Sequence, residues 1–334
     1  MDDQRLPTAS ESPVPNSSQE GGGSDKDLPS GSHMVRSENL TIKNISIFNN
    51  LRELLDMIKF EHTVFALPFA MLGGLATFRG APPLDKVIWI ILAMVGARTA
   101  AMTFNRIADQ DLDAENPRTA SRAMPAGRVS QTGAYLLLGA AIILLGVAAG
   151  RLGPLTWKLT PLALVIILGY SFCKRFTALS HVVLGLSLAG APLGAWIAVN
   201  GRLDPPAVYL ALGVLAWTAG FDIIYALQDL EFDKARGLHS IPSRLGTGWS
   251  LFLSRLFHLL ALAAWAQYNL SMDSHLLPWI GWALVALILL REQWVVRGGR
   301  LERIDHAFFT LNSLVGLIFF TGHGAEWLLA RIMP

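Results

Sequence analysis

The sequence predicts an all-α integral membrane protein with nine transmembrane helices. Three features of its composition support this: 52% of the 334 residues are hydrophobic, only 16% are charged, and the mean hydropathy is +0.42. A soluble globular protein of this length does not carry such an apolar excess. The formal net charge of +2 also argues against binding to nucleic acid, which requires a strong positive field.

Residues 1–45 are expected to form a disordered tail outside the fold. They are rich in Ser, Gly, Pro and Asp and show almost no apolar periodicity. The run Gly31-Ser32-His33-Met34 resembles the remnant of an expression tag, and Met34 fits a natural start. We therefore expect a transmembrane domain over residues 46–334.

Nine apolar segments of that domain are long enough to cross about 30 Å of hydrocarbon, which takes roughly 20 helical residues. They lie near 54–78, 86–107, 131–150, 155–173, 178–200, 206–230, 248–270, 275–296 and 305–329. When the connections are assigned alternately to the two sides, thirteen Lys and Arg residues fall on the side where the first segment begins, and six fall on the other. Because cytoplasmic connections carry the excess of Lys and Arg, we expect a multi-pass protein of the inner (plasma) membrane with its N-terminus inside.

The two longest charged connections, about 108–130 and 231–247, fall on the same, cytoplasmic side. The segment NRIADQDLD enters the first and places Asn105, Asp109 and Asp113 at i, i+4 and i+8, which is one face of a helix. The segment DIIYALQDLEFD enters the second with the same spacing, at Tyr225, Asp229 and Asp233, and with Asp222 about one turn earlier. The sequence thus predicts two carboxylate-bearing faces at one membrane surface.

Carboxylates repeated every four residues repel one another, so a bound cation is expected between them. Ligands that are all hard oxygens suit Mg²⁺, which commonly completes its coordination with waters and substrate phosphates. The expected ligand is therefore a diphosphate. Basic residues near the two motifs can grip such a group and stabilise its charge as it leaves. They include Arg118, Arg122, Lys174 and Arg244, and Tyr170 lies one turn before Lys174.

Three alternatives remain open at this stage. The aspartates can be interfacial charges that form salt bridges with the nearby arginines. They can also bind the coupling cation of a transporter, in which case acids are expected near the middle of the bilayer. A structural membrane subunit is the third alternative, and it leaves the paired acidic faces unexplained.

The two motifs resemble those of the UbiA superfamily of intramembrane aromatic prenyltransferases. The first motif continues into NPRTASRAMPAG and the second into GLHSIPSRLG, and the likeness extends from about residue 50 to the C-terminus. This resemblance implies nine helices in a ring around a central cavity, which cytoplasmic loops cap and which opens sideways to lipid. It implies that Mg²⁺ and the diphosphate are held by Asn105, Asp109, Asp113, Asp229 and Asp233.

The resemblance also implies roles for other residues. Asp222 and Tyr225 would support the metal site, and Arg118, Arg122, Tyr170 and Lys174 match positions that bind or protonate the leaving group. Lys59, near His62, is the nearest match to a basic residue of the first helix that lies close to the aromatic acceptor.

The expected reaction is the transfer of a polyprenyl group from polyprenyl diphosphate to a small aromatic acid, by electrophilic aromatic substitution. The pair Asn105-Arg106 and the run Asn116-Pro117-Arg118, with HTVFALPFA at 62–70, resemble bacterial relatives often named 4-hydroxybenzoate polyprenyltransferases. Some of these act on 1,4-dihydroxy-6-naphthoate, so both acceptors stay open, within quinone biosynthesis. The sequence identifies no base for the ring proton, and diphosphate itself is a candidate.

Overall fold

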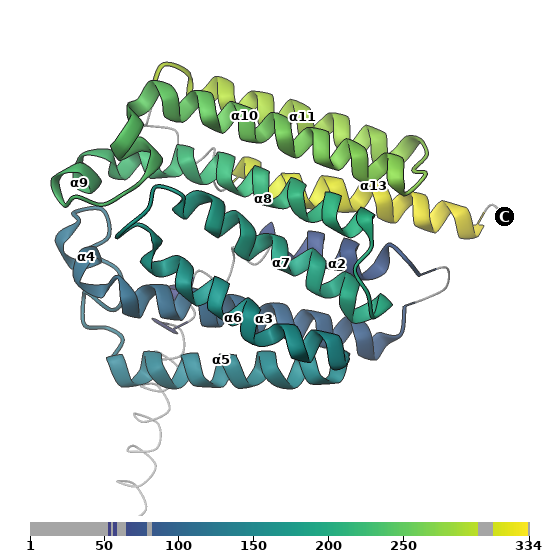
Figure 1. The fold of residues 1–334 in the computed structure, drawn as a ribbon, viewed down its shortest axis with the longest axis horizontal. Coiled ribbons are helices and arrows are strands. Elements are labelled where there is room, and N and C mark those ends of the chain that lie inside the picture. Colours follow the sequence, from purple (N-terminus) through teal and green to yellow (C-terminus); the bar gives the residue numbers. More distant parts are fainter. Residues whose placement is uncertain (1–52, 55, 59–64, 79–81, 300–309, 333–334) are drawn as a thin grey trace, which may run out of the picture. The chain divides into compact units, whose positions relative to one another are not determined.

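The computed structural model describes residues 53–54, 56–58, 65–78, 82–299 and 310–332, and the regular elements in these ranges are all helical (Figure 1). Eight helices are long and apolar enough to cross a membrane. They are α3 (Leu84–Ala108), α5 (Gln131–Leu152), α6 (Pro154–Cys173), α7 (Ser180–Asn200), α8 (Pro205–Ala226, continued by shorter helices to Ala235), α10 (Ile241–Ser271), α11 (Leu276–Val295) and α13 (Asn312–Ile332). The all-helical, multi-pass membrane fold predicted from the sequence is confirmed.

These eight helices correspond to the last eight predicted segments. The first predicted segment contains α2 (Leu67–Leu75), whose 9 residues span about 14 Å, less than a bilayer core. Residues 59–64 of that segment, and the tail predicted over 1–45, lie outside the described residues. The count of nine transmembrane helices therefore stays a prediction.

Local sequence sets several of the helix ends. The Ser130 hydroxyl accepts a hydrogen bond from the Gly133 N–H at 3.1 Å and caps the start of α5. Ser240 and Ser243 cap each other's backbone at the start of α10. α7 ends at Gly201, whose φ of 67° lies in the left-handed region that favours glycine. These caps fix where the chain leaves each helix near the connections.

Among the described residues, α2 and every membrane-length helix except α5 pack in a closed order, and α5 packs against α3 and α6. Each of the following pairs is in contact: α2 with α3, α3 with α6, α6 with α7, α7 with α8, α8 with α10, α10 with α11, α11 with α13, and α13 with α2. Short side chains let some of these backbones approach closely. A Cβ on Gly73 would lie 2.4 Å from the Pro192 carbonyl oxygen, and one on Gly185 would lie 2.4 Å from that of Leu215. The expected ring of helices is thus present, with glycine contacts on both faces of α7.

Aromatic side chains fill the part of the ring between α2, α8, α10 and α13. The Phe69 and Trp265 rings stack with centroids 5.3 Å apart, and Trp217 meets Phe221 edge-on at 5.0 Å. Trp217, Trp265 and Phe319 are fully buried. Contacts of this kind add to the stability gained from burial alone. This side of the ring is therefore solid.

A cavity of about 1070 Å³, hereafter the chamber, occupies the other part of the ring. Residues of α3, α5, α6, α7 and α8 line it, together with Phe65 and Ala66 just before α2, whereas within the described ranges α10, α11 and α13 do not. It extends from Asn105 and Arg106, near the charged connections, to Leu152 and Leu203 at the opposite ends of the helices. The cavity implied by the resemblance is present, but it lies against α3, α6 and α7 and not at the middle of the ring.

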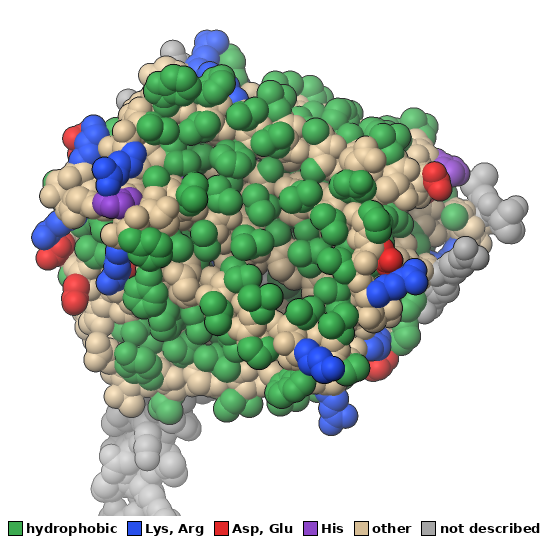
Figure 2. All heavy atoms as spheres, in the orientation of Figure 1, with side chains coloured by type: hydrophobic (Ala, Val, Ile, Leu, Met, Phe, Trp, Pro, Cys, Tyr) green, Lys and Arg blue, Asp and Glu red, His purple; other side chains and the backbone are tan. Residues whose placement is uncertain are grey.

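The outer surface matches a lipid environment. Leu136, Val165 and Leu259 are among the large hydrophobic side chains that are more than 60% exposed. Figure 2 shows hydrophobic side chains across the middle of one face, with Lys, Arg, Asp and Glu gathered toward its two ends. An apolar band between charged ends is the pattern expected of a protein embedded in a bilayer.

Candidate functional site

Each acidic motif follows a break in its helix. α3 ends at Ala108, Asp109 has φ −104° and ψ 10°, and the short helix α4 (Gln110–Glu115) then begins. In the second motif the break is at Asp229, with φ −100° and ψ 6°, between the 3₁₀ helix η2 (Leu227–Asp229) and α9 (Leu230–Ala235). Each motif therefore extends over two helical elements and not along one continuous helix. The break falls at the equivalent aspartate of each motif.

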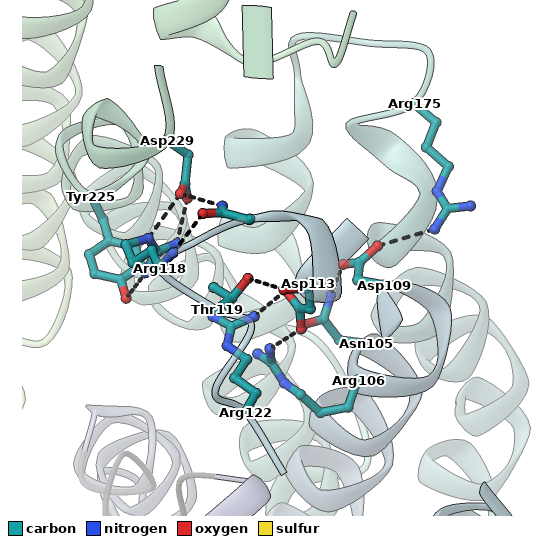
Figure 3. Close-up of polar contacts among 11 residues, drawn as sticks. Asn105, Arg106, Asp109, Asp113, Arg118, Thr119, Arg122, Arg175, Tyr225 and Asp229 are labelled. Carbon is teal, nitrogen blue, oxygen red and sulfur yellow. Dashed lines mark hydrogen bonds and ion pairs between the residues drawn. The ribbon is translucent and has the colours of Figure 1, made fainter. Parts of the chain in front are cut away.

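The two acidic segments are bonded directly to each other at one end of the ring. The Asn116 side chain donates to Asp229 Oδ1 at 2.9 Å. Arg118 donates from Nε to Asp229 Oδ1 at 2.9 Å and from Nη2 to Oδ2 at 2.5 Å, and from Nη1 to the Tyr225 hydroxyl at 3.0 Å (Figure 3). A two-pronged arginine–carboxylate pair of this kind is strong and directional. Residues after the first motif thus hold the central acid of the second.

Arginines also hold the acids of the first motif. Asp113 accepts from Arg106 at 3.1 Å and from Arg122 at 2.6 Å, and its side chain is only 9% exposed. Asp109 accepts from Arg175 at 3.2 Å and from the Asn105 amide at 2.9 Å (Figure 3). Salt bridges between these aspartates and arginines, one of the alternatives drawn from the sequence, are therefore present. They do not exclude ligand binding, because arginines that hold carboxylates can also hold phosphate.

Lys174 directly follows the end of α6. The charge of its ammonium group acts on the carboxylates of both Asp109 and Asp229. Burial raises the pKa of the Asp109 carboxyl above its ordinary value, the Asp113 charge adds to this, and Arg175 and Lys174 act against it. Burial alone would lower the pKa of Arg118, but the hydrogen bond and charge of Asp229 outweigh it and raise that pKa. The charges of the site are therefore strongly coupled.

Asp233 is the most enclosed acid of the second motif. The residue is 2% exposed, and its Oδ2 atom is buried with no hydrogen-bond partner among the described residues. A buried oxygen of this kind is costly unless a proton or a cation meets it. On the surface nearby, Arg236 pairs with Glu115 at 2.5 Å, a second link between the two segments.

The donor chemistry of the two motifs fits a hard divalent cation. The five side chains assigned to Mg²⁺ are four carboxylates and the amide of Asn105, which all offer oxygen ligands. Within the described ranges, the buried Oδ2 of Asp233 has no hydrogen-bond partner. In the part of the chain that the structure describes, no three His, Cys, Asp or Glu side chains already form a metal-binding group. Mg²⁺ commonly completes its coordination with substrate phosphate oxygens and water.

The remaining predicted residues fall into three groups. Asn105, Arg122, Tyr170, Asp222 and Tyr225 line the chamber. Arg244 contacts the ring of His239, at 2.9 Å from Nε2, and is exposed. Lys59 and His62 lie outside the described residues.

The sequence left salt bridges between the aspartates and nearby arginines open without identifying the pairs. The structure pairs Arg106 with Asp113 and Arg175 with Asp109. One further contact was not anticipated. The His181 ring contacts Asp222, with Nδ1 and Oδ2 2.7 Å apart. His181 is 41 residues from Asp222 and has no neighbouring motif, so no local signal could have identified it.

Comparison with known proteins gives consistent results. The sequence model of the UbiA prenyltransferase family matches residues 66–314. Proteins named 4-hydroxybenzoate octaprenyltransferase are among the relatives. One from Alkalilimnicola ehrlichii is 31% identical, with 76% of this chain and 87% of that protein covered. One from Idiomarina loihiensis is 32% identical, with 78% and 89% covered.

Solved structures share the fold. The apo structure of a UbiA homologue from Aeropyrum pernix superposes with a TM-score of 0.73 and 33% identity, over 81% of this chain and 98% of that one. A UbiA homologue from Archaeoglobus fulgidus, bound to GPP and Mg²⁺, gives a TM-score of 0.67 over 83% and 99% of the two chains. At 19% identity, that second likeness speaks for the fold alone.

Proposed function

Because this chain belongs to the UbiA prenyltransferase family, we propose that it transfers a polyprenyl group from polyprenyl diphosphate to a small aromatic acid. The observation that carries this proposal is the direct bonding of Asn116 and Arg118 to Asp229. It gathers both acidic motifs at one mouth of an apolar chamber. A charged diphosphate at that mouth and a prenyl chain in the chamber are then accommodated by one site.

The residues at the mouth bind the diphosphate in this proposal. Arg118 and Arg122 exchange contacts with the aspartates for contacts with phosphate oxygens, and Lys174, whose charge acts on Asp109 and Asp229, adds a further cation. The Tyr170 side chain faces the leaving group from the chamber wall. Positive groups held in place before the reaction stabilise negative charge as it develops on the leaving diphosphate. Asn105, Asp109, Asp113, Asp229 and Asp233 hold Mg²⁺. When bound, this ion neutralises diphosphate charge and so favours cleavage of the prenyl C–O bond.

The chamber protects the electrophile that this cleavage leaves. Its wall is made mostly of aliphatic side chains from α3, α6 and α7, so water has little access to an allylic cation formed inside it. The aromatic ring then attacks the cation carbon and forms a C–C bond.

The acceptor proposed for this site is 4-hydroxybenzoate or 1,4-dihydroxy-6-naphthoate. The names of the relatives from Alkalilimnicola ehrlichii and Idiomarina loihiensis support the first. Either acceptor places the reaction in ubiquinone or menaquinone biosynthesis. The excess of Lys and Arg beside the two acidic segments supports an inner-membrane location with the site on the cytoplasmic side.

A cation-coupled transporter is less well supported. It would require the acids near the middle of the bilayer. The four aspartates of the repeated motif lie beyond Ala108 and Ala226, where α3 and α8 end.

The test is a turnover assay of the purified full chain in detergent. Prenyl diphosphates of several lengths are offered with each acceptor in parallel, with Mg²⁺ or with EDTA, and products are identified by mass. Prenylated aromatic acid that forms only with Mg²⁺ is the expected result. Failure to prenylate any aromatic acid, with the prenyl diphosphate left intact, would contradict the proposal.

A further inference from the structure

Asp222 differs from the other aspartates of the two motifs in where it lies. It is in α8, before the break, and it lines the chamber together with Tyr170. Asp109, Asp113, Asp229 and Asp233 are not among the described residues that line the chamber. Asp222 is therefore the motif carboxylate that faces the apolar space, where an aromatic ring would approach the prenyl group.

The buried His181 ring orients Asp222. The side chain of His181, from the first turn of α7, is 0% exposed, and its Nδ1 lies 2.7 Å from Asp222 Oδ2. On the other side of the ring, Nε2 accepts a hydrogen bond from the Ile241 backbone N–H at 3.3 Å. An imidazole nitrogen that accepts a hydrogen bond carries no proton, so Nδ1 is the nitrogen that donates to Asp222.

This tautomer determines how Asp222 is held. Because Nδ1–H donates to Oδ2, that carboxylate oxygen acts as the acceptor. Among the described residues, the hydrogen bond of this carboxylate is the one to His181, so Oδ1 remains available to a ligand. Arg118 and Arg122, which we assign to the diphosphate, donate to Asp229 and Asp113 instead. Asp222 is thus a carboxylate that His181 holds in the chamber wall.

Building on the proposed function, we infer that Asp222 is the base that takes the ring proton from the aromatic acceptor, and that His181 is its positioning residue. The prenyl C–O bond breaks and its electron pair leaves with diphosphate. A ring carbon forms the new C–C bond to the allylic carbon, which leaves a positive charge on the ring. The proton on that ring carbon moves to Asp222 Oδ1, its C–H electron pair restores aromaticity, and Asp222 later returns the proton to water.

The direct test compares the wild-type chain with Asp222→Asn. The amide keeps an oxygen that can accept from His181, but it cannot take a proton. We expect kcat to fall by about 10²- to 10⁴-fold, the usual contribution of a general base. Each protein is also assayed with an acceptor deuterated at the carbon that is prenylated. Because proton removal becomes rate-limiting in the variant, the ratio of rates with light and deuterated acceptor should rise above the wild-type ratio.

The isotope ratio separates a base from a structural residue. A variant that merely binds substrate badly, or that folds less well, loses rate without a change in this ratio. If diphosphate itself removes the proton, Asp222→Asn leaves the ratio at its wild-type value, and the inference is wrong. The matched control is Glu231→Gln, which removes an exposed acid paired with Lys234 at 3.7 Å on the same segment. It should leave both rate and ratio unchanged.

Two variants of His181 separate its two hydrogen bonds. In His181→Asn the amide nitrogen replaces Nδ1 and can still donate to Asp222, whereas in His181→Gln the amide oxygen replaces Nε2 and can still accept from Ile241. If His181 acts through Asp222, the His181→Asn variant keeps most of kcat. The His181→Gln variant loses kcat and shows the raised isotope ratio, while its KM for the prenyl diphosphate changes little. If the Gln variant is the more active one, or if both keep the wild-type ratio, His181 does not position the base.

These outcomes are distinct from failure of the proposed function. In that case the wild-type chain prenylates no aromatic acid. If Asp222 is not the base, wild-type turnover is normal and the deuterium ratio does not respond to Asp222→Asn.

Discussion

Arg118 shows how one side chain can serve two states of the site. Its fork binds both oxygens of Asp229, and its guanidinium carbon lies 5.2 Å from the centre of the Tyr225 ring. Carboxylate and phosphate present similar pairs of oxygens to an arginine. In the structure Arg118 thus neutralises an acid that would otherwise be repelled by its neighbours. In the proposed complex the same guanidinium group is available to bind the diphosphate.

Replacing Arg118 with lysine should weaken diphosphate binding, because a lysine offers a single point charge in place of a fork. One lost charge-assisted hydrogen bond is worth about 1.5–3 kcal/mol, so we expect KM for the prenyl diphosphate to rise roughly 10- to 100-fold. The control is Arg236→Lys, which alters an exposed ion pair with Glu115. Such pairs contribute little, so this variant should keep the wild-type KM. Equal KM values for the two variants would contradict the assigned role of Arg118.

At the scale of the elements, the sequence predicted the membrane helices well. The spans predicted from hydropathy near 131–150, 155–173 and 275–296 match α5, α6 and α11 within two residues at each end. Apolar length is a local property, and the hydrocarbon thickness fixes it. The breaks at Asp109 and Asp229 were not predicted, because spacing at i and i+4 is the same whether or not one residue leaves the helical geometry. Contacts such as that of His181 with Asp222 join residues far apart in the chain and have no local signature.

The packing of α7 depends on glycine at a close approach. A Cβ on Gly185 would lie 2.4 Å from the Leu215 carbonyl oxygen of α8, so Gly185→Ala must push the two backbones apart. Overpacking of this kind costs about 1–3 kcal/mol, and we expect a lower midpoint of thermal unfolding in detergent. Gly190→Ala, on the same helix, is the matched control because nothing lies within 4 Å of its Cβ position. Equal unfolding midpoints for the two variants would show that this contact is not tight.

At the scale of the whole domain, the ring divides into a solid part and a hollow part. The aromatic side chains between α2, α8, α10 and α13 form a rigid wall, and the chamber lies on the side of α3, α6 and α7. Binding the prenyl chain there requires no rearrangement of the aromatic core. The chamber extends from the acidic segments to Leu152 and Leu203, so its free length limits how much of the chain it encloses.

Narrowing the chamber should therefore select against long substrates. Gly194 lines the chamber and has nothing within 4 Å of its Cβ position, so Gly194→Phe adds a ring without a clash next to the backbone. We expect kcat/KM to fall at least tenfold for long prenyl diphosphates and to change little for geranyl diphosphate. Competition between short and long substrates, read by product mass, measures this. An equal loss for both lengths would place the prenyl chain elsewhere.

The central claim is that the two acidic segments bind one magnesium diphosphate together. Its most direct measurement is calorimetric binding of a prenyl diphosphate to the purified chain and to Asp113→Asn and Asp233→Asn, one variant from each segment, with Mg²⁺ and with EDTA. We predict that binding to the wild-type chain requires Mg²⁺ and that each variant alone weakens it at least tenfold. Binding that persists in EDTA, or that only one of the two variants weakens, would contradict a site shared by both segments.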